Sequence, residues 1–393
     1  MDKRSLWLYA ARFFQAAAGV AVHFFFARIG GVDGYGTLSL FLSLSLIFNN
    51  FTDFGVSLNG PRLVAQGSYD MWVEAAVKWR NRLAWTSALV YLIISWLIYP
   101  GQLTVLLAGL PMIASFSRQH DWISRGKGRP DRAALRQMLQ SSAQLSGVGL
   151  VWLSGGGILA ALLVYSASAV VTYLIANHRW RLIPRQTGAH STLSFSAFAS
   201  VQWPVFAGFM AQHTSYMMAI PILTFLSGST SSGIYASHFF LFTSLGTLSV
   251  ITMEVFMAKP GSTNLQYAGW MALFTLLATL LMLAAVWYFP ILYGTKGFQL
   301  DWQLLLLNIV LLWVHAARLF WLNRLLFSHR LKSFGRAGIS GLLLHVALWI
   351  VFIVMKQEVS PQTALSLLLT AEVTNLLILP IIKINTSDHE RVL

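Results

Sequence analysis

The chain has 393 residues, of which 56% are hydrophobic and only 10% are charged. So few charges cannot cover the surface of a soluble protein of this length, which indicates an integral membrane protein. The formal net charge of +14 would suit nucleic-acid binding in a soluble chain, but in a membrane protein it reports on loop topology, so no nucleic-acid partner is expected. The absence of cysteine excludes disulfides and Cys-based metal sites.

Apolar runs separated by short polar breaks predict twelve transmembrane helices, because about twenty apolar residues cross the hydrocarbon layer. They cover residues 6–27, 37–58, 83–99, 103–117, 134–153, 158–176, 193–219, 234–257, 267–288, 304–327, 339–355 and 364–384. The seventh helix contains Pro204, and Pro221 lies just beyond it, so we expect this helix to bend or break. The predicted fold class is an all-α polytopic membrane protein.

The basic residues predict the orientation of these helices. If the N-terminus is inside, most of the 27 Lys and Arg residues fall in inner loops, so both termini are expected in the cytoplasm. The most basic segment, 118–136, is interrupted by glycines and a proline and is expected to meet lipid headgroups or a phosphorylated substrate. Residues 61–82 mix apolar and charged side chains and predict an amphipathic helix at the inner interface.

Polar side chains gather on one face of each of the first two helices. In the first helix, Arg12, Gln15 and His23 fall close to one face at helical spacing. In the second, Asn50 and Asp53 share a face with several serines. Charges that face lipid are costly, so these faces should look into a wet cavity or another helix. The alternatives are helix packing through the serines and a local salt bridge of Asp53, for instance with Arg62.

The later helices carry further polar side chains within their spans. Asn308, His315 and Arg318 share an arc of the tenth helix, whereas Arg324 lies on nearly the opposite face and can reach the cytoplasmic surface. Arg318 lies too deep to do so. The other polar residues of the second half include Gln202, Gln212, His213, His238, Glu254, Glu372 and Asn375.

A weak internal repeat relates the two halves of the chain. The glycine-rich turn and apolar span that begin near Phe26 recur about 200 residues later, as an internal duplication predicts. Tyr35 then matches Tyr235, and Asp53 falls within one residue of matching Glu254. The predicted architecture is therefore two six-helix lobes, 1–184 and 185–393, related by a pseudo-twofold axis near the membrane normal.

The sequence lacks the motifs of soluble catalytic or nucleotide-binding modules. H-E-x-x-H, G-x-S-x-G and P-loop patterns are absent. The histidines form no convincing pair of metal ligands, and no loop is long enough to hold a separate domain. We therefore expect no catalytic residues, no metal site and no cofactor, and energy from an ion gradient, the membrane potential or the substrate gradient.

Several short segments resemble one family of transporters. ARIGGVDGYGTLSLF, DFGVSLNGPRLVAQ, DWISRGKGRPDRAALRQ, GIYASHFF and YFPILYG look like the polysaccharide-export flippases of the multidrug/oligosaccharidyl-lipid/polysaccharide exporter superfamily, which include the O-antigen translocases. The resemblance implies a V-shaped central cavity and alternating access for an undecaprenyl-pyrophosphate-linked oligosaccharide. It also implies the bacterial inner membrane, contact with membrane lipids, and a polysaccharide polymerase and chain-length machinery as partners.

The resemblance gives the polar residues their expected roles. Arg12, Arg318 and His315 would meet the pyrophosphate, because guanidinium groups suit a diphosphate. The residues expected to meet the sugars are Gln15, His23, Asn50, Gln202 and Asn308. The residues expected to serve a coupling cation, a proton or sodium, are Asp53, Glu254 and Glu372. An ion pair with Glu372 is the alternative role for Arg318.

One departure from the family pattern and two other functions stay open. The acidic residue that such proteins often carry late in the seventh helix is replaced by the run from Gln212 to Ser215, so a shared ion-coupling site is not implied. A cation-coupled drug exporter of the same superfamily would use the same three acids. A membrane polysaccharide polymerase or ligase would need a long extracytoplasmic loop, and the outer loops are short.

Overall fold

The computed structural model describes residues 3–65, 69–180, 193–257, 264–293, 297–327, 331–355 and 357–378. Within these ranges all regular secondary structure is helical, which confirms the all-α prediction. The chain divides into two compact units, Met1–Phe206 and Ala207–Leu393. The lobe boundary predicted at residue 184 falls among residues outside the described ranges.

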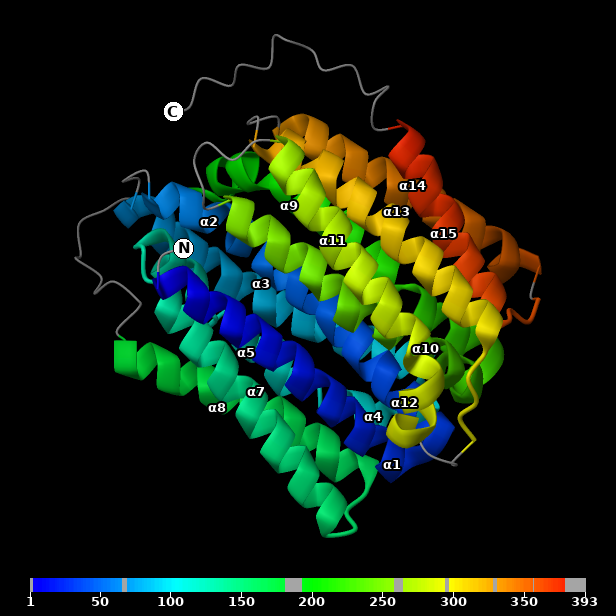
Figure 1. Ribbon diagram of the computed structural model, residues 1–393. Coiled ribbons are helices and arrows are strands. Elements are labelled where there is room, and N and C mark those ends of the chain that lie inside the picture. Colours follow the sequence, from blue (N-terminus) through cyan, green and yellow to red (C-terminus); the bar gives the residue numbers. More distant parts are fainter. Residues whose placement is uncertain are drawn as a thin grey trace. The chain divides into compact units, whose positions relative to one another are not determined.

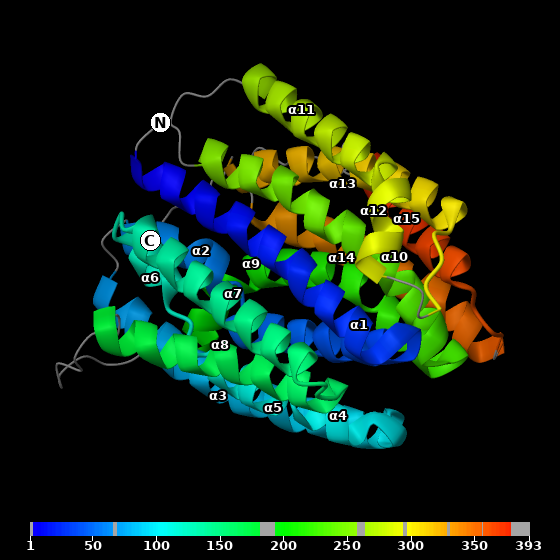
Figure 2. The same cartoon turned by 60° about the horizontal axis from the view of Figure 1, so that its bottom comes forward.

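Unit 1 is built around a long first helix. Its helices are α1 (Lys3–Asp53), α2 (Val56–Ala65), α3 (Tyr69–Ile98), a 3₁₀ turn (Pro100–Gln102), α4 (Leu103–Leu107), α5 (Leu110–Phe116), α6 (Asp121–Gly126), α7 (Pro130–Leu153), α8 (Ile158–Trp180) and the first half of α9 (Phe195–Met217). α1 packs along α7, and α7 and α8 form an antiparallel pair (Figures 1 and 2).

Unit 2 contains the rest of α9 and six further helices. They are α10 (Ala219–Met257), α11 (Asn264–Leu283), α12 (Ala285–Tyr293), α13 (Trp302–Phe327), α14 (Leu331–Met355) and α15 (Pro361–Ile378). α13 lies against α10, α11, α14 and α15, so its side chains meet four neighbouring helices (Figure 1). This central place puts the polar residues of α13 in the interior of the unit.

The described helices account for the expected membrane crossings. Seven are long and apolar enough to span a bilayer, or eight if the bent pair Pro100–Leu107 and Leu110–Gly126 is one span. Two runs, Ala10–Ala65 with 56 residues and Phe195–Gly246 with 52, far exceed the length that one crossing needs. Each is broken by a glycine and supplies two crossings. With α7 and α15, which coincide with predicted spans, the helices match the twelve expected.

Two glycines break the long helices α1 and α10. Gly31 breaks α1 at φ 63° and ψ −162°, and Gly228 breaks α10 at φ 81° and ψ 176°. These conformations are accessible to glycine and strained for other residues. A separate break at Met218 divides α9 from α10 three residues before Pro221, while α9 continues through Pro204. The break predicted for the seventh span thus lies at Met218, near Pro221, and not at Pro204.

One predicted element is wrong. Residues 69–82 were expected to form part of an interfacial amphipathic helix, but they are the first part of α3, which runs without interruption to Ile98. Trp72 and Arg80 in this segment are buried. The buried face of the segment therefore packs inside unit 1, where the charge of Arg80 is neutralised by Asp53.

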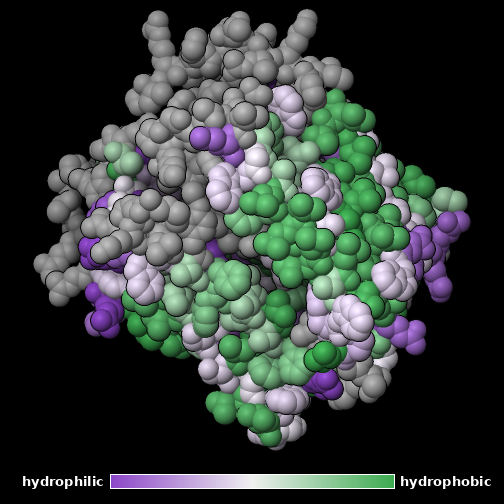
Figure 3. Space-filling model, in the orientation of Figure 1, coloured by the Kyte–Doolittle hydropathy of each residue, from purple (hydrophilic) through white to green (hydrophobic). Residues whose placement is uncertain are grey.

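Large apolar side chains remain exposed on several helices. On α11 they include Trp270, Leu273, Leu276, Leu277 and Leu280. Figure 3 shows a broad green surface over this part of the molecule. A helix that faces lipid presents such side chains outward, while its backbone groups are bonded within the helix.

Candidate functional site

The predicted coupling residue Asp53 lies in a buried ion pair at the end of α1. Its carboxylate accepts hydrogen bonds from the backbone N–H of Ser57 at 3.0 Å and from the Ser57 hydroxyl at 2.6 Å. Arg80 of α3 approaches it to 3.3 Å and also donates to the carbonyl oxygens of Gln119 and Phe116. A buried salt bridge is therefore present at Asp53, but its partner is Arg80 of α3 and not Arg62, which the sequence suggested.

A second buried pair joins α6 to α7 in the same unit. Arg136 lies 2.6 Å from Asp121 through Nη2 and donates from Nε to both of its carboxylate oxygens, at 2.7 and 2.8 Å. Its remaining terminal nitrogen donates to Gln140. Every nitrogen of this guanidinium is thus bonded, which a buried charge requires to be stable.

The basic segment 118–136 uses part of its charge internally. Besides Arg136, Arg125 donates to the Ser57 carbonyl oxygen at 2.9 Å. The expected breaks are confirmed, since α6 ends at Gly126, Gly128 has φ +66°, and α7 begins at Pro130. Arg129 is partly exposed and pairs with Asp131 beside it in sequence.

Unit 2 contains one buried ion pair of a different kind. Arg318 of α13 donates through Nη1 to Oε1 of Glu372 on α15, and both side chains are 2% exposed. The Tyr216 ring of α9 lies under the guanidinium carbon at 5.5 Å, and its hydroxyl is 2.8 Å from Nδ1 of His315. The carboxylate of Glu372 lies beside the same hydroxyl. Three helices therefore bring four polar side chains together.

This cluster has hydrogen-bonding atoms that are not used. Among the described residues, Nε and Nη2 of Arg318 and Oε2 of Glu372 are buried without a hydrogen-bond partner. Both amide atoms of Asn375, one turn along α15, are in the same state, and so is Oδ1 of Asn308. Buried polar groups are normally bonded, so unbonded ones leave donors and acceptors that water, an ion or a ligand can satisfy.

The other residues predicted to meet the substrate belong to unit 1. Arg12 donates to Gln15 at 3.2 Å on the same turn of α1. His23 is 2.7 Å from the Tyr35 hydroxyl, which joins the two arms of α1. Asn50 and Gln202 are buried, at 5% and 0% exposure, and both amide atoms of Gln202 lack partners within the described part of the chain.

Within unit 2 the structure brings several of the predicted site residues together. Arg318, His315 and Glu372 form one cluster, and Asn308 lies on the same helix, fully buried. Tyr216 was missed, although it follows the polar run from Gln212 to Ser215 that the sequence singled out. The side chains of Glu254 and Arg324 lie outside the described residues.

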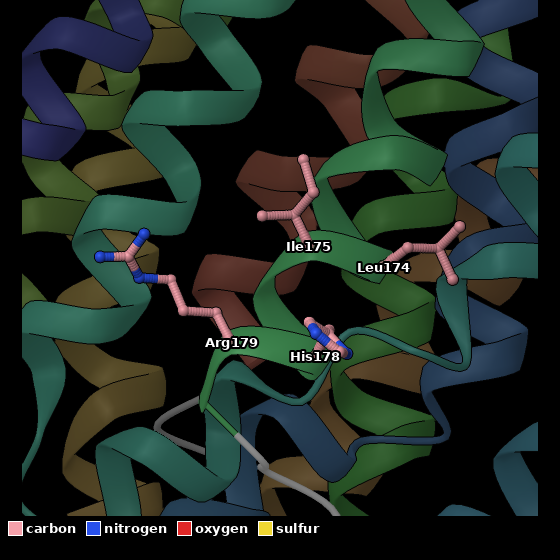
Figure 4. Close-up of a pocket in the computed structure, with 4 residues that line it drawn as sticks. All are labelled: Leu174, Ile175, His178 and Arg179. Carbon is pink, nitrogen blue, oxygen red and sulfur yellow. The ribbon is translucent and has the colours of Figure 1, made fainter.

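The surface hollow in unit 1 is not this site. It is open and is lined by Leu174, Ile175, His178 and Arg179, all from α8 (Figure 4). None of the residues predicted to bind substrate or cation borders it. In the described part of the chain, no group of three or more His, Asp or Glu side chains is placed to hold a metal ion.

Known structures share the fold, whereas sequence comparisons find no relative. No protein-family model and no curated protein matches the chain. The lipid II flippase MurJ in an inward closed conformation has a TM-score of 0.71 at 12% identity, over 95% of this chain and 86% of that one. An inward-facing MATE multidrug resistance transporter of the MOP superfamily has a TM-score of 0.64 at 12% identity, over 98% and 100% of the two chains.

A third similar structure is the MATE multidrug transporter DinF-BH. Its TM-score is 0.65 at 11% identity, over 96% of this chain and 93% of that one. At these identities the likeness establishes the fold. The chain therefore has the MATE- and MurJ-like transporter fold with about 12 helices.

Proposed function

Because the chain has the fold of MOP-superfamily transporters, we propose that it flips an undecaprenyl-pyrophosphate-linked oligosaccharide across the bacterial inner membrane, from the cytoplasmic to the outer leaflet. The observation that carries this proposal is the buried guanidinium of Arg318, which retains two unbonded donor nitrogens. A guanidinium binds the oxygens of a diphosphate through paired hydrogen bonds, and a low-dielectric site strengthens them.

The proposed mechanism is alternating access between two lobes, 1–184 and 185–393, related by a pseudo-twofold axis. Arg318, His315 and Arg12 would bind the pyrophosphate. The sugars would meet the amide, imidazole and other polar groups of Gln15, His23, Asn50, Gln202 and Asn308. The polyprenyl tail would stay in lipid, because moving it through a polar path would expose its apolar surface. A polysaccharide polymerase and chain-length machinery would then use the product outside.

The second candidate function is a cation-coupled multidrug exporter, which the likeness to MATE transporters favours. Such an exporter would use Asp53, Glu254 and Glu372 to bind a proton or sodium. Asp53 and Glu372, however, each face an arginine at ion-pairing distance. A carboxylate that is already neutralised by an arginine attracts a cation weakly, so we rank this function second.

A reconstituted system separates the two functions. The protein is placed in liposomes that carry a fluorescent undecaprenyl-pyrophosphate oligosaccharide in one leaflet, and movement to the other leaflet is followed by quenching. We expect flipping that empty liposomes do not show. Efflux of cationic dyes under a proton or sodium gradient, with no flipping of the lipid-linked sugar, would contradict the proposal and favour the exporter.

The orientation has its own test. We propose that both termini and residues 118–136 are cytoplasmic. The chain has no native cysteine, so a Gly128→Cys variant offers a single thiol. A membrane-impermeant maleimide should label it in inside-out vesicles and leave it unlabelled in intact cells. The reverse labelling would overturn the orientation.

A further inference from the structure

The Arg318–Glu372 pair has one bonded side and one unbonded side. Nη1 of Arg318 is engaged by Oε1 of Glu372, while Nε and Nη2 have no partner among the described residues. These two nitrogens form the edge of the guanidinium that grips two oxygens of a carboxylate or phosphate at once. The guanidinium therefore presents its better binding edge away from its present partner.

We infer that Arg318 exchanges Glu372 for the anionic headgroup of the substrate, and that Glu372 takes up a proton when Arg318 leaves it. The inference rests on the proposed function, since it requires an anionic substrate at Arg318. A phosphate group binds both terminal and internal nitrogens of a guanidinium and competes with a single contact to a carboxylate. Binding thus draws Arg318 away from Glu372.

The departure of Arg318 leaves Glu372 without its counter-charge. The carboxylate is 2% exposed, and a buried charge without a partner is strongly unfavourable. The other titratable groups around the pair do not supply a fixed positive charge in its place. They are Tyr216 and His213 of α9, Tyr235 of α10, His315 of α13 and His345 of α14. Protonation of the carboxylate removes the charge.

Tyr216 and His315 provide a route for that proton. His315 binds a proton from water at Nε2 and passes the proton on Nδ1 to the Tyr216 hydroxyl oxygen, 2.8 Å away. Tyr216 in turn gives its own hydroxyl proton to the Glu372 carboxylate beside it. At the end Tyr216 is again a neutral phenol, His315 is neutral, and Glu372 carries one proton from solution. Substrate binding and proton uptake are then coupled through one pair.

The coupling is measurable with a short prenyl pyrophosphate. Farnesyl pyrophosphate is added to the purified full-length protein in nanodiscs, in weakly buffered solution with a pH-indicating dye. We expect uptake of about one proton per bound molecule beyond that of a Glu372→Gln variant. Subtracting the variant removes protons bound by the pyrophosphate itself. The Glu372→Gln variant should bind the probe at least as tightly, because its amide competes weakly for Arg318.

Three further measurements control this result. Glu358→Gln removes an exposed acid just before α15 and should leave proton uptake unchanged. If Glu372→Gln fails to fold, infrared difference spectroscopy of the unmodified protein should show the carbonyl stretch of a newly protonated carboxylic acid when the probe binds. Arg318→Lys should weaken probe binding by about tenfold, because lysine lacks the two-pronged donor edge.

The outcomes distinguish this inference from the proposed function. Binding of the probe with no proton uptake beyond Glu372→Gln and no new carbonyl band would overturn the exchange and leave the flippase function standing. Flipping of the lipid-linked sugar in liposomes without any binding of the probe would also overturn it. Failure of both probe binding and flipping would remove the proposed function itself.

Discussion

The two units of the chain treat their buried arginines differently. In unit 1, Arg136 bonds all three of its guanidinium nitrogens to protein atoms, and Arg80 bonds both terminal nitrogens. In unit 2, Arg318 bonds one nitrogen and leaves two buried without a partner among the described residues. An arginine with its terminal nitrogens bonded stabilises a fold, whereas one with a terminal nitrogen to spare can still receive a ligand.

The number of hydrogen bonds that each guanidinium makes distinguishes arginines that hold helices together from one that can still bind a ligand. In unit 1, Arg80 links α3 to the end of α1 through a carboxylate and to the end of α5 through backbone carbonyl groups. Arg136 links α7 to α6 through a carboxylate. The unit 2 arginine pairs with an acid and lies over an aromatic ring. Substitutions in the unit 1 arginine pairs should therefore act on stability, and those of Arg318 in unit 2 on transport.

The largest effect is expected in unit 1. Arg136→Met leaves the Asp121 carboxylate buried without its partner, which costs about 3–5 kcal/mol. We expect little folded protein by fluorescence-detected size-exclusion chromatography. The double variant Asp121→Leu with Arg136→Met removes both charges and should recover much of the loss. A single variant as stable as the unmodified chain would show that this pair does not hold the unit together.

Asp53→Asn should have a smaller effect of the same kind. The amide keeps an acceptor oxygen for Ser57 but loses the charge that neutralises Arg80, which we expect to cost about 1–3 kcal/mol. Arg80 retains its two backbone carbonyl partners, which limits the loss. The thermal unfolding temperature should fall while the ion dependence of transport stays unchanged. A changed ion dependence with unchanged stability would return Asp53 to a coupling role.

Arg318→Lys tests the binding site in unit 2. The charge remains, so the protein should be as abundant as the unmodified chain, while flipping in liposomes falls by about tenfold, or about 1.4 kcal/mol. Arg129→Lys is the matched control, because Arg129 is partly exposed and pairs with Asp131 beside it in sequence. Arg318→Ala, if lost from the membrane and rescued by neutralising Glu372, would instead show a structural pair.

The two glycine breaks should be equally sensitive in both units. Gly31→Ala and Gly228→Ala place a side chain at positive φ, which costs about 1–2 kcal/mol each. Gly19→Ala is the control within a helical arm of α1, where an added methyl group meets no atom within 4 Å. That change should be neutral or slightly stabilising in a thermal-shift assay. Equal tolerance at all three positions would refute the strain argument.

The smallest effect is expected at Glu358, which is exposed before α15. Glu358→Gln should change stability by less than about 0.5 kcal/mol and leave transport intact. A large transport defect in this variant would show that Glu358, and not Glu372, is the functional acid. The buried pair of unit 2 would then have no special role in transport.

The membrane crossings could be predicted because hydropathy is a local property. Each predicted span has a matching helix, and the bend near Pro221 follows from a residue that cannot donate its backbone N–H. The partners of buried charges could not be predicted in the same way. Arg80 lies among charged neighbours that suggested an interface, and Asp121 and Arg136 meet only because the chain turns between α6 and α7.

The unit 2 cluster was predicted in part. Arg318 and Glu372 stood out as charges inside spans, so their ion pair was foreseen as one of two roles. Tyr216 gave no comparable signal, because an aromatic residue in an apolar helix is normally packing. Its role depends on the contact of α9 with α13, which no short-range pattern encodes.

The break at Gly31 also bears on how the first two crossings are connected. α1 turns back within a helix of 51 residues, and Gly31 is its non-helical residue. The charged residues of the turn are Arg28 and Asp33. The connection between the two arms is therefore short, with almost no hydrophilic loop. The two arms of α1 thus share one interruption of helical backbone, and the His23–Tyr35 contact joins them beside it. Nearly all backbone groups of both crossings are bonded within the helix, as the hydrocarbon layer requires.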